Sequence, residues 1–249
     1  MSWTVVLPYF NEVAYLPATI ASLLAQNLKP SRLILVDNAS TDGSADLARS
    51  LTASTLIDVL HLHEPRPGKI NALETGLARV ETDFVATCDA DTFYPPHYLE
   101  TADAVLRESD DIVAAMAVGS QKTAPRVKAM IVSAILSRQT HTGGFGQSFR
   151  TSALRQAGGF STSQWSFVLE DHEIMQRLFK IGRAKHVFDL WCTPSNRRAD
   201  RANVNWNTGE QLLYHLTPFA LKDWFFYRFL ARRFTQRGLG NVNLREKTW

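Results

Sequence analysis

The chain has 249 residues, of which 45% are hydrophobic and 20% are charged. This length suits one large α/β domain or two small ones, and the composition is that of a soluble globular protein, not of a disordered or fibrous one. No N-terminal signal-peptide pattern and no apolar run long enough for a membrane span is present. The two cysteines, Cys88 and Cys192, form no paired-cysteine metal motif, so a reducing, cytoplasmic location is expected.

The net charge of +3 is unevenly distributed along the chain. Residues 196–249 contain ten Lys or Arg and four Asp or Glu, whereas the first 195 residues contain 17 and 20. A basic C-terminal region suits a partner with phosphate groups: a nucleotide diphosphate, a nucleic acid or an anionic lipid. A solvated basic surface without any partner explains the pattern equally well.

Strand-like and helix-like segments alternate over the first 120 residues. Apolar runs rich in β-branched residues predict five strands, which begin at Trp3, Arg32, Leu56, Asp83 and Asp111. Apolar residues at helical spacing predict helices at about 16–24 and 70–80. The alternation predicts an α/β fold with a Rossmann-like, mostly parallel sheet and helices on both faces. Its active site is expected at the carboxyl ends of the strands.

The pattern is less regular after residue 120. It predicts a helix at about 124–138, a glycine-rich loop at 141–146, a helix from Glu170 and a strand from Ala184. Aromatic-rich helices with many arginines are expected from about Asn205. No linker is visible, so we expect one continuous domain at 1–195 and a helical C-terminal extension at 196–249. Because the pattern changes at about residue 120, this domain is expected to have two parts, 1–120 and 121–195.

Three carboxylates stand at the ends of predicted strands, where a doubly wound sheet places its ligand. Asp37 ends the second strand, and Asp89 and Asp91 follow the fourth. Residues two apart in an extended chain point to the same side, so Asp89 and Asp91 are expected to face one point. Paired carboxylates favour a divalent cation, and their hard oxygen ligands favour Mg²⁺ or Mn²⁺. Such a cation would neutralise charge on a departing diphosphate.

Asp37, Arg66 and Lys69 each have two readings. The Asp37 carboxylate can accept a hydrogen bond from a pyrimidine base, or it can simply begin a turn. Arg66 and Lys69 precede the helix predicted at about 70–80, where backbone N–H groups also bind anions, so they suit a phosphate site. As solvent-facing charges, they would need no ligand.

The segment from Glu170 predicts a helix whose apolar stripe begins at Ile174. At about 100° per residue, Glu170 and Asp171 continue this buried stripe, whereas His172 and Glu173 are expected to point away. Carboxylates on the buried side are costly unless they bind something, and the helix N-terminus favours their ionised form. Asp171 is therefore suited to act as a general base. The alternative is a carboxylate that the helix dipole merely stabilises.

These signals, taken in order, resemble the family 2 glycosyltransferases of the GT-A fold. The resemblance covers about residues 3–190, and the combination of motifs is more specific than any one of them. The motifs are LPYFNE at 7–12, VDNASTDGS at 36–44, GKINALETGL at 68–77, CDAD at 88–91, GGF at 158–160 and ED at 170–171.

The resemblance implies a role for each matching position. The nucleotide, most often uridine diphosphate in this family, would be held by Pro8, Tyr9, Glu12 and Asp37. Asp89, with its neighbour Ala90, would contact the ribose side of the nucleotide sugar. Asp89 and Asp91 would bind the metal, with Asp91 as the main ligand. Asp171, beside Glu170, would deprotonate the acceptor hydroxyl, and direct attack would invert the anomeric carbon.

The sequence departs from the family pattern in two places. The Q-x-x-R-W motif of processive synthases is missing, so transfer of one sugar is expected instead of polymerisation. The segment TPSNRRADR at 193–201 only loosely resembles the loop that covers the diphosphate in some relatives. Arg197, Arg198 and Arg201 are its candidate diphosphate ligands. Neither the sugar nor the acceptor is identified, although a saccharide or a lipid-linked acceptor is expected.

Three other functions fit parts of the sequence. A sugar nucleotidyltransferase would place a glycine-rich phosphate loop after the first strand, but PYFNE at 8–12 has no glycine. An inactive nucleotide-sugar binder or scaffold would lack the base or the metal motif, and both are present. A nucleic-acid reader would show a recognition motif, and none is found, so no nucleic-acid partner is expected.

The segment DWFFYRFLARRFTQR at 223–237 interleaves aromatic residues with arginines. Such a helix suits the headgroup layer of an anionic membrane, where rings sink in and guanidinium groups meet lipid phosphates. Peripheral contact with the inner face of a membrane would place a lipid-linked acceptor beside the active site. The alternative is an aromatic helix that packs on its own domain.

Overall fold

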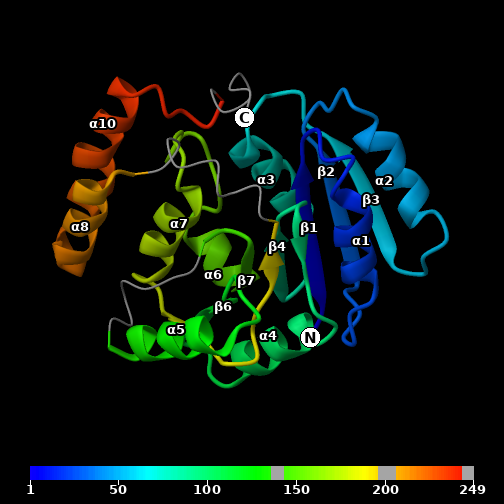
Figure 1. Cartoon of the computed structure of the whole chain (residues 1–249), viewed down its shortest axis with the longest axis horizontal. Coiled ribbons are helices and arrows are strands. Elements are labelled where there is room, and N and C mark those ends of the chain that lie inside the picture. The colour runs from blue at the N-terminus through cyan, green and yellow to red at the C-terminus, as the bar shows by residue number, and fades with distance from the viewer. Residues whose placement is uncertain (136–142, 196–205, 243–249) are drawn as a thin grey trace.

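A seven-stranded sheet with the order β3-β2-β1-β4-β7-β6-β8 forms the centre of the molecule (Figure 1). The computed structural model describes residues 1–135, 143–195 and 206–242. The strands are β1 (Trp3–Tyr9), β2 (Arg32–Asp37), β3 (Asp58–His63), β4 (Phe84–Cys88), β6 (Ile112–Met116), β7 (Gly146–Arg150) and β8 (Arg183–Lys185). A small second sheet pairs β5 (Thr92–Phe93) with β9 (Thr193–Pro194).

The predicted, mostly parallel sheet is confirmed. Strands β3, β2, β1 and β4 run parallel to one another, and β6 runs parallel to β8. The exception is β7, which pairs antiparallel with both β4 and β6. The sequence did not predict β7, because its polar residues hide the apolar signal of a buried strand. The strand predicted from Ala184 is shorter than expected, since β8 ends at Lys185.

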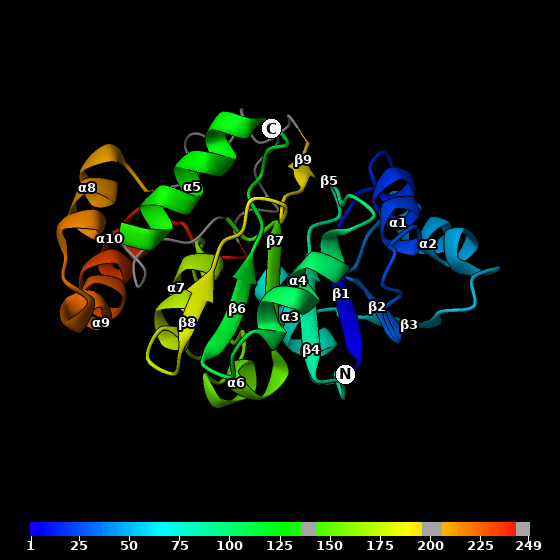
Figure 2. The same cartoon turned by 90° about the horizontal axis from the view of Figure 1, so that it is seen from below.

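Helices cover both faces of the sheet, as predicted (Figures 1 and 2). Alternate residues of β1 and β2 point to opposite faces, so each strand contributes to two separate apolar clusters. One face carries α1 (Leu16–Leu24), α2 (Ser44–Thr52) and α4 (Tyr98–Arg107). The other carries α3 (Lys69–Leu77), α6 (Thr151–Gln156) and α7 (Glu170–Leu178).

Helix α5 (Thr123–Ile135) lies on the outside of the molecule, with only Arg126 buried among its residues (Figure 2). It corresponds to the helix predicted at about 124–138, whose last residues fall outside the described part of the chain. In the described ranges no helix has the length and apolar character that a membrane span requires.

The C-terminal segment is helical, as predicted, and packs over α7. It comprises α8 (Thr208–Leu216), a 3₁₀ turn η2 (Phe219–Leu221), α9 (Lys222–Trp224), a π-helical stretch η3 (Phe225–Leu230) and α10 (Ala231–Gln236). A capping box between Asn207 and Glu210 starts α8. Glu210 also holds α10 against α8 through Arg233 at 2.6 Å and Arg237 at 2.8 Å.

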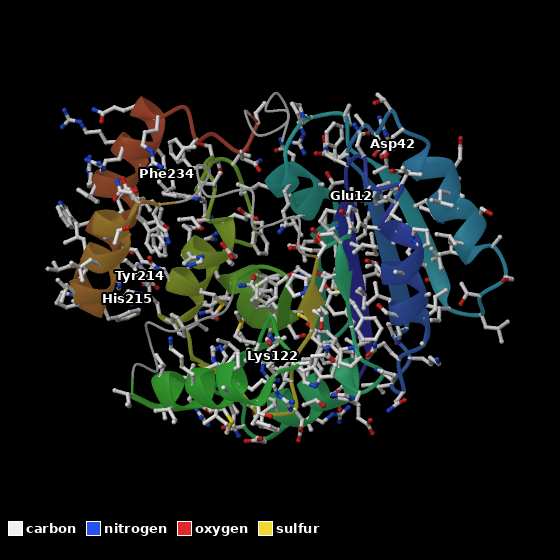
Figure 3. The ribbon with its side chains drawn as sticks, in the orientation of Figure 1. Glu12, Asp42, Lys122, Tyr214, His215 and Phe234 are labelled. Atoms are coloured by element: carbon white, nitrogen blue, oxygen red, sulfur yellow. The ribbon has the colours of Figure 1, made fainter. Side chains whose placement is uncertain are left out.

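Three of the six aromatic rings expected at a membrane surface lie in the core instead. Phe225, Phe226 and Phe234 are fully buried, and Phe226 and Phe234 lie 5.7 and 6.2 Å from the Trp165 ring, between centroids. Figure 3 shows Phe234 in the C-terminal helices, at the far end of the molecule from Glu12 and Asp42. The packing alternative is therefore confirmed for these three rings. Trp224 remains half exposed.

The prediction that Glu173 points away from the buried side of its helix is wrong. Its carboxylate is fully buried, forms a bidentate pair with Arg177 and accepts a hydrogen bond from the Tyr227 hydroxyl. His172 is also mostly enclosed, since its ring lies 4.7 Å from that of Trp206 and 6.2 Å from that of Tyr214. The C-terminal helices cover the side of α7 that the helical wheel assigned to solvent.

Candidate active site

Three non-glycine residues with positive φ stand beside the predicted site motifs. Asn11 follows β1 with φ of 53°, Ala39 follows β2 with φ of 59°, and Leu169 precedes α7 with φ of 64°. Ala39 and Leu169 have no polar side chain that could stabilise this conformation, so each costs on the order of 1–2 kcal/mol. Strain of this kind persists where the surrounding structure fixes the backbone, often at functional sites. The strained residues Asn11 and Ala39 therefore mark the carboxyl edge of the sheet.

Asp37 lies at the end of β2 and pairs with a histidine that the sequence did not single out. Its Oδ2 is 3.1 Å from Nδ1 of His63, the last residue of the neighbouring β3, and its Oδ1 accepts from the Ser40 amide at 3.0 Å. The turn reading of Asp37 is confirmed, because Oδ1 accepts from the Ser40 amide, while Oδ2 lies beside the exposed ring of His63. His63 was missed because the predicted strand had no polar end of its own.

Tyr9 is the register partner of Asp37 in the parallel pair β1–β2. Burial, with the nearby Asp37 charge, raises the pKa of the Tyr9 hydroxyl well above its usual range. Pro8 precedes it in β1, and Glu12 lies beyond the strand end, where its amide donates to Ser44 Oγ at 2.9 Å. The opening motif is thus brought next to Asp37, as the resemblance implies.

Asp89 and Asp91 follow β4 and are mostly buried. The chain turns at Ala90 and Asp91, so the extended-strand argument that aimed both carboxylates at one point was wrong in its geometry. Asp89 Oδ1 lies 2.7 Å from the Lys69 ammonium, whereas Asp91 Oδ2 accepts from Ser195 Oγ at 2.9 Å. The pairing of β5 with β9 therefore places the start of the arginine-containing segment beside Asp91.

The chemistry of this pair suits a metal bound together with its substrate. No group of three or more His, Cys, Asp or Glu that could hold a metal occurs in the described residues. Mg²⁺ in particular is usually bound by one or two carboxylates, with substrate phosphates and water completing its shell. Two carboxylates at a strand end fit that mode, and they do not fit a resident all-protein cage.

Lys69 connects the CDAD motif at 88–91 to the ED motif at 170–171. Its ammonium lies 2.7 Å from Asp89 Oδ1 and 3.3 Å from Glu170 Oε1. Asn38 positions the preceding turn, because its side chain accepts from the Gly68 amide at 2.9 Å and donates to the Arg66 carbonyl at 2.8 Å. Gly68 has φ of 117°, and a Cβ there would collide with the Asn241 side chain, so only glycine fits before α3.

Arg66 does not reach the Asp89 pair in this arrangement. Its guanidinium binds Glu64 through Nε at 2.9 Å and Nη2 at 2.8 Å, and Nη1 lies 3.4 Å from Glu74. These hydrogen bonds lower the pKa of the Glu64 carboxyl to about 2. Arg66 remains half exposed, so its charge faces solvent at the rim of the site.

Asp171 is anchored through one of its two carboxylate oxygens. Oδ1 accepts from the backbone amide of His172 at 2.9 Å and lies 2.9 Å from Nδ1 of the same residue. Oδ2 faces the glycine pair, since a Cβ at Gly143 or Gly144 would lie 3.7 or 3.5 Å from it. Bulkier residues there would crowd this oxygen.

Glu170 shares the pocket with Asp171. Burial raises the pKa of the Glu170 carboxyl above its usual value, the Asp171 charge adds to the rise, and the Lys69 ammonium opposes it. The first turn of α7 therefore carries two carboxylates in unlike surroundings, as an acid–base site requires.

One pocket joins these residues across both halves of the chain. Its lining comprises Lys69, Leu73, Thr87, Cys88, Asp89, Gly144, Gln147, Phe160, Glu170 and Asp171. Phe160 belongs to the predicted GGF motif, whereas Gln147 was missed together with β7. The Gln147 amide donates to the Asp171 carbonyl at 3.4 Å, which ties β7 to α7. Arg197, Arg198 and Arg201 lie outside the described residues.

The chain matches known proteins in sequence. The model of the family described as Glycosyl transferase family 2 matches residues 4–168, which is more than half of the chain. The chain belongs to this family. The match ends just before Glu170 and Asp171, so the candidate base lies beyond it.

Two curated relatives indicate the range of similarity. The succinoglycan biosynthesis protein ExoA of Rhizobium meliloti is 29% identical over 206 residues, which cover 76% of this chain and 60% of that protein. An undecaprenyl-phosphate 4-deoxy-4-formamido-L-arabinose transferase of Serratia proteamaculans is 33% identical over 140 residues, which cover 52% of this chain and 42% of that protein. The chain thus matches less than two thirds of either relative's length.

Solved structures share the fold. The mannosyltransferase PcManGT from Pyrobaculum calidifontis, in complex with GDP-Man and Mn²⁺, has a TM-score of 0.71 at 22% identity, covering 86% of this chain and 62% of that one. The glucosyl-3-phosphoglycerate synthase from Mycobacterium tuberculosis, in complex with Mn²⁺, UDP-Glc and phosphoglyceric acid, has a TM-score of 0.54 at 16% identity, covering 97% and 82%. These similarities confirm the GT-A-like fold.

Proposed function

We propose that this family 2 glycosyltransferase is a metal-dependent, inverting enzyme that moves one hexose-like sugar from a nucleotide diphosphate sugar to an acceptor hydroxyl. The observation that carries the proposal is the single pocket that holds Asp89 and Asp171, which lie 82 positions apart in the sequence. A donor phosphate site and a general base need this proximity, because the attacking oxygen and the leaving diphosphate bind the same anomeric carbon.

The donor would lie along the carboxyl edge of β1, β2 and β4. In this proposal Asp37 accepts from the base, with uracil as the first candidate, and His63 lies beside the same contact. Pro8, Tyr9 and Glu12 line the nucleotide, Ala90 and Asp89 the ribose side, and Lys69, Arg66, Arg197 and Arg198 the diphosphate. Residues 1–120 would therefore be the donor half of the domain, 121–195 the acceptor half and 196–249 the extension that supports it.

Asp89 and Asp91 would hold the divalent cation, Mn²⁺ or Mg²⁺, together with diphosphate oxygens. When bound, the cation neutralises charge on the departing diphosphate. The solved relatives that contain Mn²⁺ and a nucleotide sugar support this assignment. Lys69 supplies a second, permanent positive charge within hydrogen-bonding distance of Asp89.

Asp171 would act as the general base. Its Oδ2 faces the glycine pair and can take the proton of an acceptor hydroxyl, while Oδ1 stays fixed by His172. The acceptor oxygen then bonds to the anomeric carbon as the bond from that carbon to the diphosphate oxygen breaks. Attack from the side opposite the leaving group inverts the configuration. Glu170, which the Lys69 charge contacts, is the alternative base.

The acceptor class is taken from the relatives. One is named as an undecaprenyl-phosphate transferase and another as a succinoglycan biosynthesis protein. These names support a saccharide or lipid-linked acceptor in glycolipid or surface polysaccharide synthesis. We propose that the chain works at the cytoplasmic side of an anionic membrane, as a peripheral protein.

The test is release of nucleoside diphosphate from a panel of UDP-, GDP- and other nucleotide sugars, with Mn²⁺ or with chelator. Each nucleotide is also tested for thermal stabilisation of the chain. Asp91→Ala should abolish both turnover and the Mn²⁺-dependent part of the stabilisation, while the unliganded midpoint stays unchanged. Full activity in excess chelator would refute the metal role. Stabilisation by a nucleotide sugar without diphosphate release, across the acceptors tried, would indicate an inactive binder.

A further inference from the structure

Helix α5 turns its polar side inward and its apolar side outward. The inward Arg126 donates to the Phe188 carbonyl at 2.7 Å, pairs with Asp189 at 3.2 Å and lies over the Phe188 ring. Ser133, seven positions later, hydrogen-bonds His186 Nδ1 at 3.1 Å. Polar contacts therefore attach α5 to the domain, where a surface helix normally uses its apolar stripe.

The outward side carries four large apolar residues at spacings of three and four positions. Val127 is 41% exposed, Met130 39%, Ile131 55% and Ile135 74%. These residues form one stripe, which we call the α5 stripe. A stripe this exposed in a 13-residue helix is unfavourable in water, so it fits a helix that is covered in use.

The part of the chain that contains α5 carries only positive charges. Residues 112–169 contain six Lys or Arg and no Asp or Glu. Of these cations, Lys128 is exposed on α5 itself and Lys122 is exposed just before it. Asp189, an acidic residue that contacts α5, is already paired with Arg126. Exposed apolar residues bordered by lysines are complementary to an anionic lipid surface.

The α5 stripe is also close in sequence to the glycine pair, Gly143 and Gly144, which lies beside the candidate base. Seven residues separate Ile135 from Gly143, and the glycine pair there faces Asp171. Figure 2 shows α5 along the outside of the molecule on the acceptor half, with α8 near its end. Helix α8 adds two more exposed apolar residues, Leu212 at 59% and Leu216 at 70%.

We propose that the α5 stripe, with Lys128 at its border, docks this chain on an anionic lipid surface. The docking follows from the exposure and charge of α5, and only the choice of a lipid-linked acceptor as its purpose rests on the proposed function. A second copy of the chain fits less well. A helix of this length offers roughly 20 Å by 10 Å, or about 200 Å², against about 800 Å² per partner in a stable interface. Two copies would also bring their lysines together.

The proposal moves the membrane contact away from residues 223–237, whose rings are largely buried. It uses apolar side chains that are exposed in the folded chain, so docking requires no rearrangement of the core. Lipid would cover the apolar residues, and Lys128 and Lys122 would meet the headgroup phosphates.

The experiment is co-sedimentation of the full chain with phosphatidylcholine vesicles, with or without phosphatidylglycerol, at low and high salt. Binding is expected with the anionic vesicles and should weaken with salt. The double variant Ile131→Gln/Ile135→Gln should bind at least about tenfold more weakly, and Lys128→Gln about fivefold more weakly. The matched control is Leu56→Gln, because Leu56 is fully exposed and lies just before β3, the strand at the end of the sheet away from α5 (Figure 2). It should bind as the unchanged chain does.

Failure of the wild-type chain to bind anionic vesicles at low salt would overturn the proposal, as would equal binding by the double variant. Sedimentation velocity without lipid is run in parallel, and a dimer that the double variant abolishes would assign the stripe to a second copy. Diphosphate release is measured on the same variants, and none of the substitutions should change it with a soluble donor. Vesicle binding without any turnover would leave docking standing and refute the proposed function instead.

Discussion

His172 was expected to point away from the buried side of its helix, but it contacts the candidate base Asp171. Its Nδ1 and its backbone amide both lie 2.9 Å from Asp171 Oδ1, and its ring is enclosed by Trp206 and Tyr214. His172→Phe keeps an aromatic ring in that enclosure and removes the side-chain donor. His172→Asn keeps a donor close to the Nδ1 position and removes the ring. The two variants therefore separate hydrogen bonding from packing.

A hydrogen bond to a charged group contributes about 1.5–3 kcal/mol, and each 1.36 kcal/mol corresponds to a factor of ten in rate. Full loss of orientation would thus lower kcat roughly tenfold to a hundredfold. Because the His172 amide still holds Oδ1, we expect about tenfold for His172→Phe. His172→Asn should stay within about threefold of the original rate, since a charge-assisted donor is retained.

The sign of the pH effect distinguishes positioning from a packing defect. A hydrogen-bond donor favours the ionised form of a carboxylate, so removal of the His172 donor should make Asp171 easier to protonate. The acid limb of the kcat profile should then move to higher pH in His172→Phe and stay in place in His172→Asn. The assay is diphosphate release against pH, with the thermal midpoint as a folding control. Equal losses in both variants, without movement of the acid limb, would refute the positioning role.

Three further predictions follow from the same helix. Asp171→Asn should lower turnover by about 10²–10⁴-fold and leave nucleotide binding intact, and near-normal turnover would transfer the base role to Glu170. Glu170→Gln should raise the thermal midpoint at neutral pH. A raised carboxyl pKa means that the folded state binds more protons than the unfolded one, so this stability cost grows as pH rises above 4.5 and vanishes at lower pH. Tyr227→Phe should cost about 1–2 kcal/mol because the buried Glu173 loses a partner, and calorimetry should show a midpoint roughly 2–8 °C lower.

The first half of the fold, residues 1–120, was predictable because its signals are local. Each of β1, β2 and β4 is a short apolar run with a polar residue at its end or just after it, and a parallel sheet brings such ends to one edge. The antiparallel β7 was not predictable in this way. Its sequence GQSFR has neither a continuous apolar run nor an apolar alternation, and it is buried only because β4 and β6 flank it.

The candidate site was predicted as a set of motifs, but not as a set of contacts. That Lys69 would bridge Asp89 and Glu170 depends on how α3, β4 and α7 pack together, and no local pattern encodes that packing. His63 has a weaker but real signal, since it ends a strand next to the one that carries Asp37. A rule that examines the residue directly after every predicted parallel strand would have found it.

The helical wheel on α7 succeeded for one side and failed for the other, for a physical reason. It placed Glu170 and Asp171 toward the sheet, where the pocket lies. The helical wheel wrongly assigned Glu173 to the solvent side, because a periodic pattern assumes that a helix has a single covered side. Here a second layer, made of α8 and the helix from Lys222 to Gln236, covers the opposite side and supplies Tyr227. Glu173 and Arg177 are four positions apart on α7, and under this second layer they form a buried ion pair. Their spacing was visible in the sequence, but their burial depends on the covering layer.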